Sequence, residues 1–244
     1  MFKHLHIRFQ TAAMIPAPFA HFYTLTARPA FTNFLQLEFS ITYPDREELD
    51  EEDITGEGFT LHDDFSWSGR LPNTWLTVVN DLLERSQLVA FDENQLDEGD
   101  DYFEVTIDRG DGPQTGTPAD KDAFQYPIQE LIQAIYEAGE KERPFLLTYL
   151  NVQKGADAEV RIKASFAERT LKAEMVQDRR SRNRTLPWSD LEGIMSVIYA
   201  IDYDPETAFE RPPSRDGHYL NLGGDEWYDV GDQPAIQKLF KRLL

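Results

Sequence analysis

Alternation of apolar and polar residues is the strongest pattern along this chain, and it predicts β-strands. In Phe34–Tyr43 the odd-numbered residues are apolar, and from Gln36 on the even-numbered residues are polar. A period of two residues places one set on the covered face of a sheet and the other set in water. Similar patterns predict further strands at Phe2–Gln10, Phe59–Trp67, Phe103–Asp108, Glu159–Phe166 and Thr170–Val176. Phe145–Val152 is apolar on both faces, which is typical of a central strand that helices cover.

Four segments have the apolar spacing of helices, and a proline stands at the start of each. These prolines are Pro72, Pro127, Pro187 and Pro234. Proline suits the first turn of a helix, because the N–H group that it lacks would have no partner there. The first three prolines lie 55 and 60 residues apart and follow strand patterns. A repeated strand–strand–helix unit is one interpretation, and ordinary helix starts are the other.

These elements predict an α+β fold, in which three or four proline-initiated helices pack on a largely antiparallel β-sheet. Acidic or Gly- and Pro-rich segments are expected to be loops, namely Asp45–Gly58, Asp92–Asp101, Gly110–Asp122 and Asp204–Gly217. None of them has the length or composition of an interdomain linker. We therefore expect residues 1–244 to form a single domain, with a soft boundary near residues 110–122 as the alternative.

The composition limits the cellular compartments and the types of functional site that we expect. The chain has no cysteine, which excludes disulfides, thiolate metal sites and cysteine nucleophiles. Its N-terminal residues have no continuous apolar segment like that of a secretory signal. No stretch of the sequence is apolar over the roughly 18 residues that a membrane span needs. We expect a cytoplasmic protein that does not bind membranes.

Negative charge is concentrated in one part of the sequence. Residues 45–108 hold 20 of the 44 acidic residues and only three basic ones, in a chain with a formal net charge of −20. Such a field attracts cationic partners and repels polyanions, so it argues for a basic protein partner and against nucleic acid. The residues predicted to contact that partner are Glu47, Glu48, Asp50, Glu51, Glu52 and Asp53. Salt adaptation is the alternative, and it predicts carboxylates spread over all exposed faces.

A second segment has the opposite charge. Residues 141–184 hold 11 basic and six acidic residues. The segment ends in four arginines just before Pro187, which are Arg179, Arg180, Arg182 and Arg184. Because the guanidinium fork binds carboxylates and phosphates well, we predict that these arginines bind an anion. The alternative is intramolecular, since the positive segment could lie against the acidic loops of its own chain.

Histidines supply the candidate metal ligands. His4 and His6 share one face of the first predicted strand, and His62 is followed by two aspartates. Imidazole and carboxylate groups bind divalent metals. These residues therefore support an alternative function, a metal- or carboxylate-dependent hydrolase with a divalent metal as cofactor. That function requires His4, His6 and His62 to converge with Asp63 or Asp64 in one pocket.

No short catalytic motif decides among these functions. The sequence lacks the Gly-x-Ser-x-Gly elbow, the phosphate-binding glycine loop and the His-Glu-x-x-His helix. Our first hypothesis is therefore a non-enzymatic binding protein whose acidic face docks onto a basic partner. The hydrolase is the second hypothesis. The third is a structural or assembly subunit that docks through the amphipathic C-terminal helix Pro234–Leu244.

Overall fold

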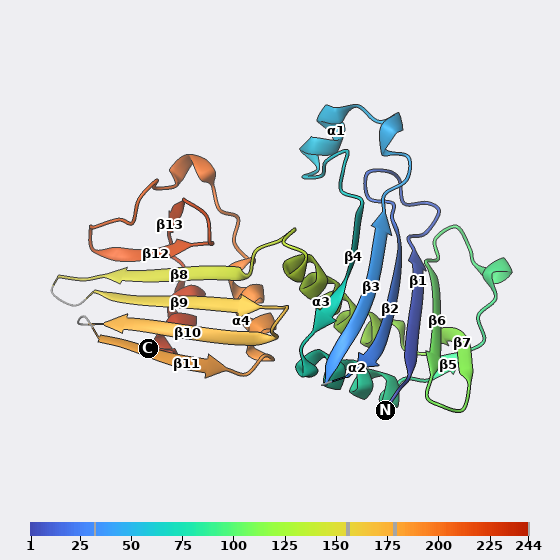
Figure 1. Ribbon diagram of the computed structural model, residues 1–244. Coiled ribbons are helices and arrows are strands. Elements are labelled where there is room, and N and C mark those ends of the chain that lie inside the picture. The colour runs from blue at the N-terminus through green and yellow to red at the C-terminus, as the bar shows by residue number, and fades with distance from the viewer. Residues whose placement is uncertain (32, 155–156, 178–179, 244) are drawn as a thin grey trace. The chain divides into compact units, whose positions relative to one another are not determined.

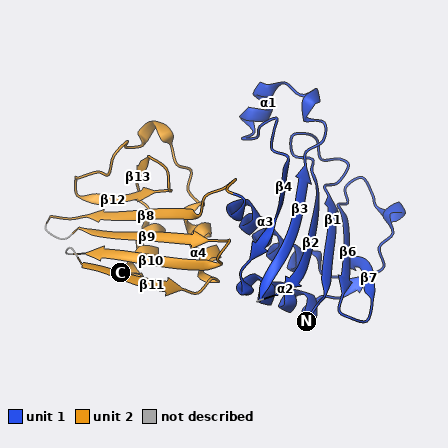
Figure 2. Cartoon of the chain, viewed as in Figure 1, with its two compact units in different colours: residues 1–139 blue, residues 140–244 orange. Residues whose placement is uncertain are grey.

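The computed structural model describes residues 1–31, 33–154, 157–177 and 180–243, and these form two compact units (Figures 1 and 2). Unit 1 is residues 1–139 and unit 2 is residues 140–244. Each has an antiparallel sheet and helices, so the predicted α+β class is confirmed, with two sheets in place of one. The division follows Gly139, whereas residues 110–122 lie inside unit 1. Single-domain behaviour in unfolding stays a prediction.

Unit 1 has a seven-stranded sheet with the order β4-β3-β2-β1-β6-β7-β5. The strands are β1 (His4–Gln10), β2 (Phe22–Ala30), β3 (Phe34–Thr42), β4 (Phe65–Leu71), β5 (Leu88–Val89), β6 (Tyr102–Asp108) and β7 (Pro113–Pro118). Helices α2 (Asn73–Arg85) and α3 (Lys121–Ala138) cover one face of this sheet (Figure 1). Alternate strand residues such as Leu37 and Ile107 are fully buried, as are Trp75 and Leu131 of the two helices. The opposite face stays polar because the alternation of the sequence places Thr, Ser, His and Arg there.

Unit 2 has a six-stranded sheet with the order β11-β10-β9-β8-β12-β13. The strands are β8 (Phe145–Val152), β9 (Ala158–Ser165), β10 (Thr170–Gln177), β11 (Arg180–Leu186), β12 (Gly217–Asn221) and β13 (Trp227–Asp229). Its core joins the sheet to helices α4 (Asp190–Ile198) and α5 (Pro234–Lys241). The predicted central strand is β8, which lies between β9 and β12. The expectation that both of its faces are covered is wrong, because Leu147 and Tyr149 lie in the core whereas Leu146 on the other face is exposed. No helix among the described residues is long and apolar enough to cross a membrane.

All four expected loops contain some regular structure. The segment Asp45–Gly58 forms the short helices η1 (Arg46–Glu48) and α1 (Glu51–Gly56), and Asp92–Asp101 contains η2 (Glu93–Gln95). The loop predicted at Gly110–Asp122 is wrong, because β7 lies within it and pairs with β6. The segment Asp204–Gly217 is irregular apart from the single turn η3 (Pro205–Thr207).

Two predicted element starts also need correction. The strand predicted at Phe59–Trp67 begins only at Phe65, because hydrogen bonds to Asp63 hold residues 60–63 in a turn. The helix predicted to start at Pro127 begins six residues earlier, where the Asp120 side chain accepts a hydrogen bond from the N–H of Ala123. An N-cap of this kind satisfies a helical donor that has no partner within the helix.

The other three prolines stand at or near helix starts. Pro72 is the N-cap of α2, Pro234 is the first residue of α5, and α4 begins three residues after Pro187. Among the described residues, a pair of neighbouring strands precedes a helix four times, as β3–β4–α2 (with η1 and α1 between the strands), β6–β7–α3, β10–β11–α4 and β12–β13–α5. However, β4 and β11 are edge strands and β7 is not. The strand–strand–helix succession therefore occupies different positions in the two sheets. Whether the three segments that end at α2, α3 and α4 are a true repeat stays a prediction.

Candidate functional site

The acidic residues predicted to meet a partner project from one end of unit 1. Residues 45–64, here called the acidic lobe, connect β3 to β4 and lie beyond the ends of these strands (Figure 1). All six predicted residues are exposed, namely Glu47, Glu48, Asp50, Glu51, Glu52 and Asp53. Ile54 is the one fully buried residue of α1, and its carbonyl oxygen accepts a hydrogen bond from the N–H of Phe59. The structure thus places the predicted residues on the two short helices η1 and α1 and on Asp50, the N-cap of α1.

A buried arginine holds the acidic lobe together. Arg46 is only 2% exposed. Its Nε and Nη2 donate to the carbonyl oxygen of Pro18 at 3.1 and 2.9 Å, and its Nη1 donates to the carbonyl oxygen of Thr60 at 2.7 Å. Its guanidinium carbon lies 3.9 Å from the ring centre of Tyr43 and 4.7 Å from that of Phe59. Hydrogen bonds and aromatic faces together offset the loss of water around the charge.

The charge of Arg46 is balanced inside the lobe rather than at its surface. Nη1 of Arg46 also donates to Oδ2 of Asp63 at 2.6 Å. Asp63 accepts two further hydrogen bonds from the backbone N–H and the hydroxyl of Thr60, at 2.8 and 2.6 Å. Partial burial raises the pKa of Asp63, but the hydrogen bonds from Thr60 and the charge of Arg46 outweigh it and lower this pKa. Because Arg46 is paired with Asp63, it does not neutralise any of the six exposed carboxylates.

The lowered pKa of Asp63 predicts that the acidic lobe loosens in acid. A carboxyl group whose pKa is lower in the folded state stabilises that state above its unfolded pKa, near 3.8. The stabilisation is lost as the pH falls through the lowered folded value. We expect the amide resonance of Phe59 to report this loss in an NMR titration from about pH 6 to pH 2. The same transition in an Asp63→Asn variant would assign it to another group.

The residues considered for a hydrolase have structural roles. Asp63 belongs to the Arg46 ion pair, and Oδ1 of Asp64 accepts a hydrogen bond from the backbone N–H of Tyr43 at 2.9 Å. His62 is exposed in the acidic lobe. These contacts fix a turn and a strand end.

His4 and His6 lie on the open face of the unit 1 sheet. Their ring centroids are 6.4 Å apart, and Nδ1 of His6 is 3.0 Å from the hydroxyl of Thr26. Burial, and then the neighbouring His4 and Arg8, lower the pKa of His6. In the part of the chain that the structure describes, no three His, Asp or Glu side chains lie together as metal ligands would. The convergence that the metal-dependent hypothesis requires is therefore not seen among these residues.

The predicted anion-binding arginines lie in unit 2. Arg179 is outside the described residues, whereas Arg180, Arg182 and Arg184 are exposed in β11. Residues 141–184 thus belong to unit 2 and residues 45–108 to unit 1. The sequence did not suggest that the three arginines share one strand.

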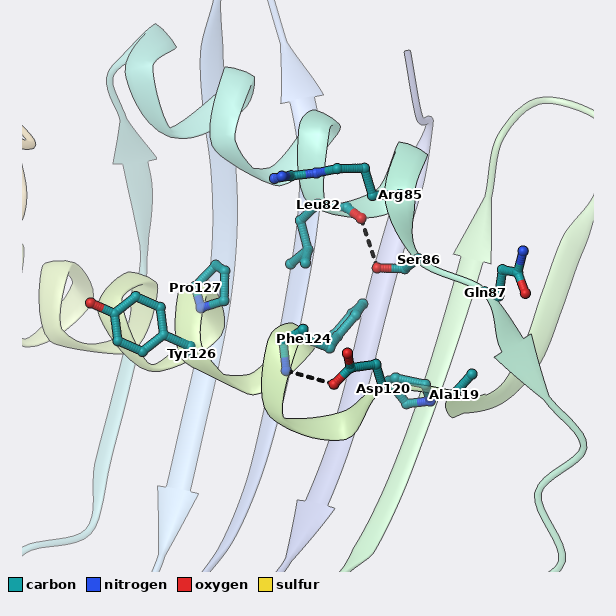
Figure 3. A pocket seen from close by; sticks show the side chains of 11 residues that line it. Leu82, Arg85, Ser86, Gln87, Ala119, Asp120, Phe124, Tyr126 and Pro127 are labelled. Atoms are coloured by element: carbon teal, nitrogen blue, oxygen red, sulfur yellow. Dashed lines mark hydrogen bonds between the residues drawn. The ribbon is translucent and has the colours of Figure 1, made fainter. Parts of the chain in front are cut away.

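A hollow of about 610 Å³ lies between the end of α2 and the start of α3 (Figure 3). Its wall is largely apolar and includes Leu82 and Phe124. Its polar groups serve the helix ends: Nε of Arg85 donates to the carbonyl oxygen of Asp81, the hydroxyl of Ser86 donates to that of Leu82, and Asp120 caps α3. This hollow has room for a ligand, but its polar groups do not form a reactive set.

Arg46 is the residue that sequence reasoning missed. It is the one basic residue between Asp45 and Gly58, and this isolation is the only local signal of its role. Its aromatic and carbonyl contacts come from sequence positions as far away as Pro18.

No protein-family model matches the chain, and no curated protein or solved structure is significantly similar to it. Its function is therefore inferred from the arrangement of its own residues.

Proposed function

We propose that this is a non-enzymatic binding protein whose acidic lobe docks onto a basic protein partner. The observation that supports it is the build of the lobe. Six exposed carboxylates stand on an element whose only arginine is buried and paired with Asp63. The interior is thus neutralised while the exterior keeps its full negative charge.

The buried arginine orders the backbone of the acidic lobe before any partner binds. A flexible acidic loop would lose conformational entropy on binding, and that loss would weaken the complex. Arg46 connects Pro18, Thr60 and Asp63, so the backbone on both sides of α1 is already ordered. Complementary charge on such a surface raises the association rate and the specificity for a basic partner.

The other hypotheses have less support. The hydrolase lacks a set of converging groups among the described residues. The assembly subunit would dock through the C-terminal helix, but Ile236 and Phe240 of α5 are buried in the core of unit 2 itself. The apolar face of α5 is therefore packed within unit 2, where it does not provide a docking surface. Salt adaptation stays a prediction, and it requires no particular partner.

A capture experiment with matched variants tests the proposal. The lobe variant converts all six carboxylates to amides: Glu47→Gln, Glu48→Gln, Asp50→Asn, Glu51→Gln, Glu52→Gln and Asp53→Asn. The control variant makes the same changes at exposed residues of unit 2: Glu168→Gln, Glu192→Gln, Glu206→Gln, Glu210→Gln, Asp216→Asn and Asp225→Asn. Both variants have the same net charge.

We expect a basic protein in the native lysate to be retained by the unmodified chain and the control variant, and to bind the lobe variant about tenfold more weakly or worse. Six partly screened ion pairs of about 0.2–1 kcal/mol each account for this factor. Retention should also fall as the salt concentration rises. Mass spectrometry identifies the retained proteins, and calorimetry with the purified partner gives the affinities. Equal retention by all three proteins would contradict the proposal.

A further inference from the structure

Strand β11 forms one edge of the unit 2 sheet. Among the strands that the structure describes, β10 is its only neighbour (Figure 1). The pairing runs in continuous antiparallel register from Leu171 opposite Leu186 to Gln177 opposite Arg180. Its first six residues are exposed, and only Leu186 is buried. The outer edge of this strand therefore presents backbone N–H and C=O groups that could pair with a further strand.

Three arginines occupy alternate positions of this edge. Arg180, Arg182 and Arg184 share a face of the sheet with Leu186, because side chains two residues apart point the same way. Their partners on β10 are Gln177, Met175 and Ala173, so the neighbouring strand offers them no carboxylate. The arginine row is thus a line of positive charge along an open edge.

The one acidic residue of β10 lies on the opposite face and is already engaged. Glu174 is opposite Asn183, out of phase with the arginines. Its Oε1 accepts a hydrogen bond from the hydroxyl of Ser181 at 2.7 Å, and its Oε2 lies 3.4 Å from Nη1 of Arg161. The neighbouring strand therefore has no free carboxylate for the arginine row, whose members are exposed at the sheet edge on the same face as the buried Leu186.

We propose that β11 is a docking edge for an extended, acidic segment of a partner protein, which adds to the sheet as a seventh strand. Successive arginines on one face are about 6.7 Å apart, which is also the spacing of every second side chain in an added strand. Acidic residues at alternate positions of that segment can each meet one guanidinium fork. The same row repels a second copy of β11, so the edge selects against self-pairing. The acidic lobe cannot supply this strand in its folded form, because it contains η1 and α1.

Fluorescence anisotropy with a defined peptide tests the charge requirement. The probe is a labelled peptide with glutamate at every second position and threonine or valine between. We expect the full chain to bind it, and Arg180→Gln/Arg182→Gln/Arg184→Gln to bind it about threefold to a hundredfold more weakly, since three exposed ion pairs are lost. The matched control is Arg143→Gln/Arg211→Gln/Arg215→Gln, which removes three exposed arginines of the same unit. Equal weakening in both variants would overturn the proposal.

Two N-methylated peptides test the strand geometry on the unmodified protein, so this test does not depend on variant folding. One peptide carries N-methyl groups on the glutamates and the other on the intervening residues. In an added strand only one set of N–H groups faces β11, so one peptide should lose binding and the other should keep it. If both bind as well as the unmodified probe, or the unmodified probe does not bind, the docking edge is refuted.

Discussion

Replacing Arg46 with methionine is expected to release the acidic lobe while unit 1 stays folded. Methionine keeps much of the side-chain volume but leaves the carbonyl groups of Pro18 and Thr60 without their donor. Removing one partner of a buried ion pair costs about 3–5 kcal/mol. We expect a value near the lower limit, about 3 kcal/mol, because Asp63 keeps its hydrogen bonds from Thr60.

Amide hydrogen exchange measures this change locally. The N–H of Ile54 donates to the carbonyl oxygen of Asp50, and the N–H of Phe59 donates to that of Ile54. Both bonds belong to the lobe, so exchange at these amides should accelerate about a hundredfold. Exchange in β2 and β3 should be unchanged, since the sheet core does not depend on Arg46.

An exposed arginine provides the control for the loss of charge. Arg28 lies 3.5 Å from Glu38, and both side chains are more than half exposed. Arg28→Met should change stability by less than about 1 kcal/mol. If Arg46→Met and Arg28→Met alter exchange in the lobe equally, the guanidinium group of Arg46 does not hold the lobe.

The same substitution separates charge from order in the proposed function. Arg46→Met retains all six exposed carboxylates and makes the net charge of the lobe more negative by one. If charge alone attracts the basic partner, binding should strengthen. Because we propose that the ordered backbone contributes, we expect weaker binding despite the additional negative charge. Calorimetry with the partner identified by the capture experiment distinguishes the two results.

The strands that were predictable have one face in a core and the other in water. In β3 the buried residues are Leu35, Leu37, Phe39 and Ile41, and this alternation is visible in the sequence. Strand β11 has no such signal, because Arg and Ser, Asn or Thr alternate along an edge that is exposed at six positions. Strand β7 was hidden by its two prolines and a glycine. Binary pattern reports burial, so strands that bury little are difficult to predict from it.

The candidate site was predictable in its charge but not in its construction. The six carboxylates follow from the local sequence. The burial of Arg46 depends on Tyr43, Phe59 and the Pro18 carbonyl, which meet only after the sheet has formed. Charge clusters are properties of sequence, whereas a buried ion pair is a property of packing between segments that are distant along the chain.

Phe240→Ala is expected to produce the largest loss of stability in unit 2. Phe240 is fully buried, and its ring stacks on Tyr149 with centroids 4.3 Å apart and an interplanar angle of 3°. Removing a buried phenylalanine ring costs about 3–5 kcal/mol, because apolar area is lost and a cavity remains. Denaturant unfolding, together with amide hydrogen exchange in β8 and β9, measures the loss in the free energy of unfolding. Lys241→Ala, at an exposed position of the same helix, should change stability by about 0.5 kcal/mol or less.

The exchange of unit 1 in this variant tests the single-domain prediction. If the two units unfold together, exchange of the most protected amides in β1 and β3 should accelerate along with those of β8 and β9, because all of them report one global transition. If each unit unfolds by itself, only β8 and β9 should respond, and the boundary at Gly139 would separate two domains. A loss below about 1 kcal/mol in unit 2 would contradict the core position of α5, and would return the C-terminal helix to consideration as a docking element.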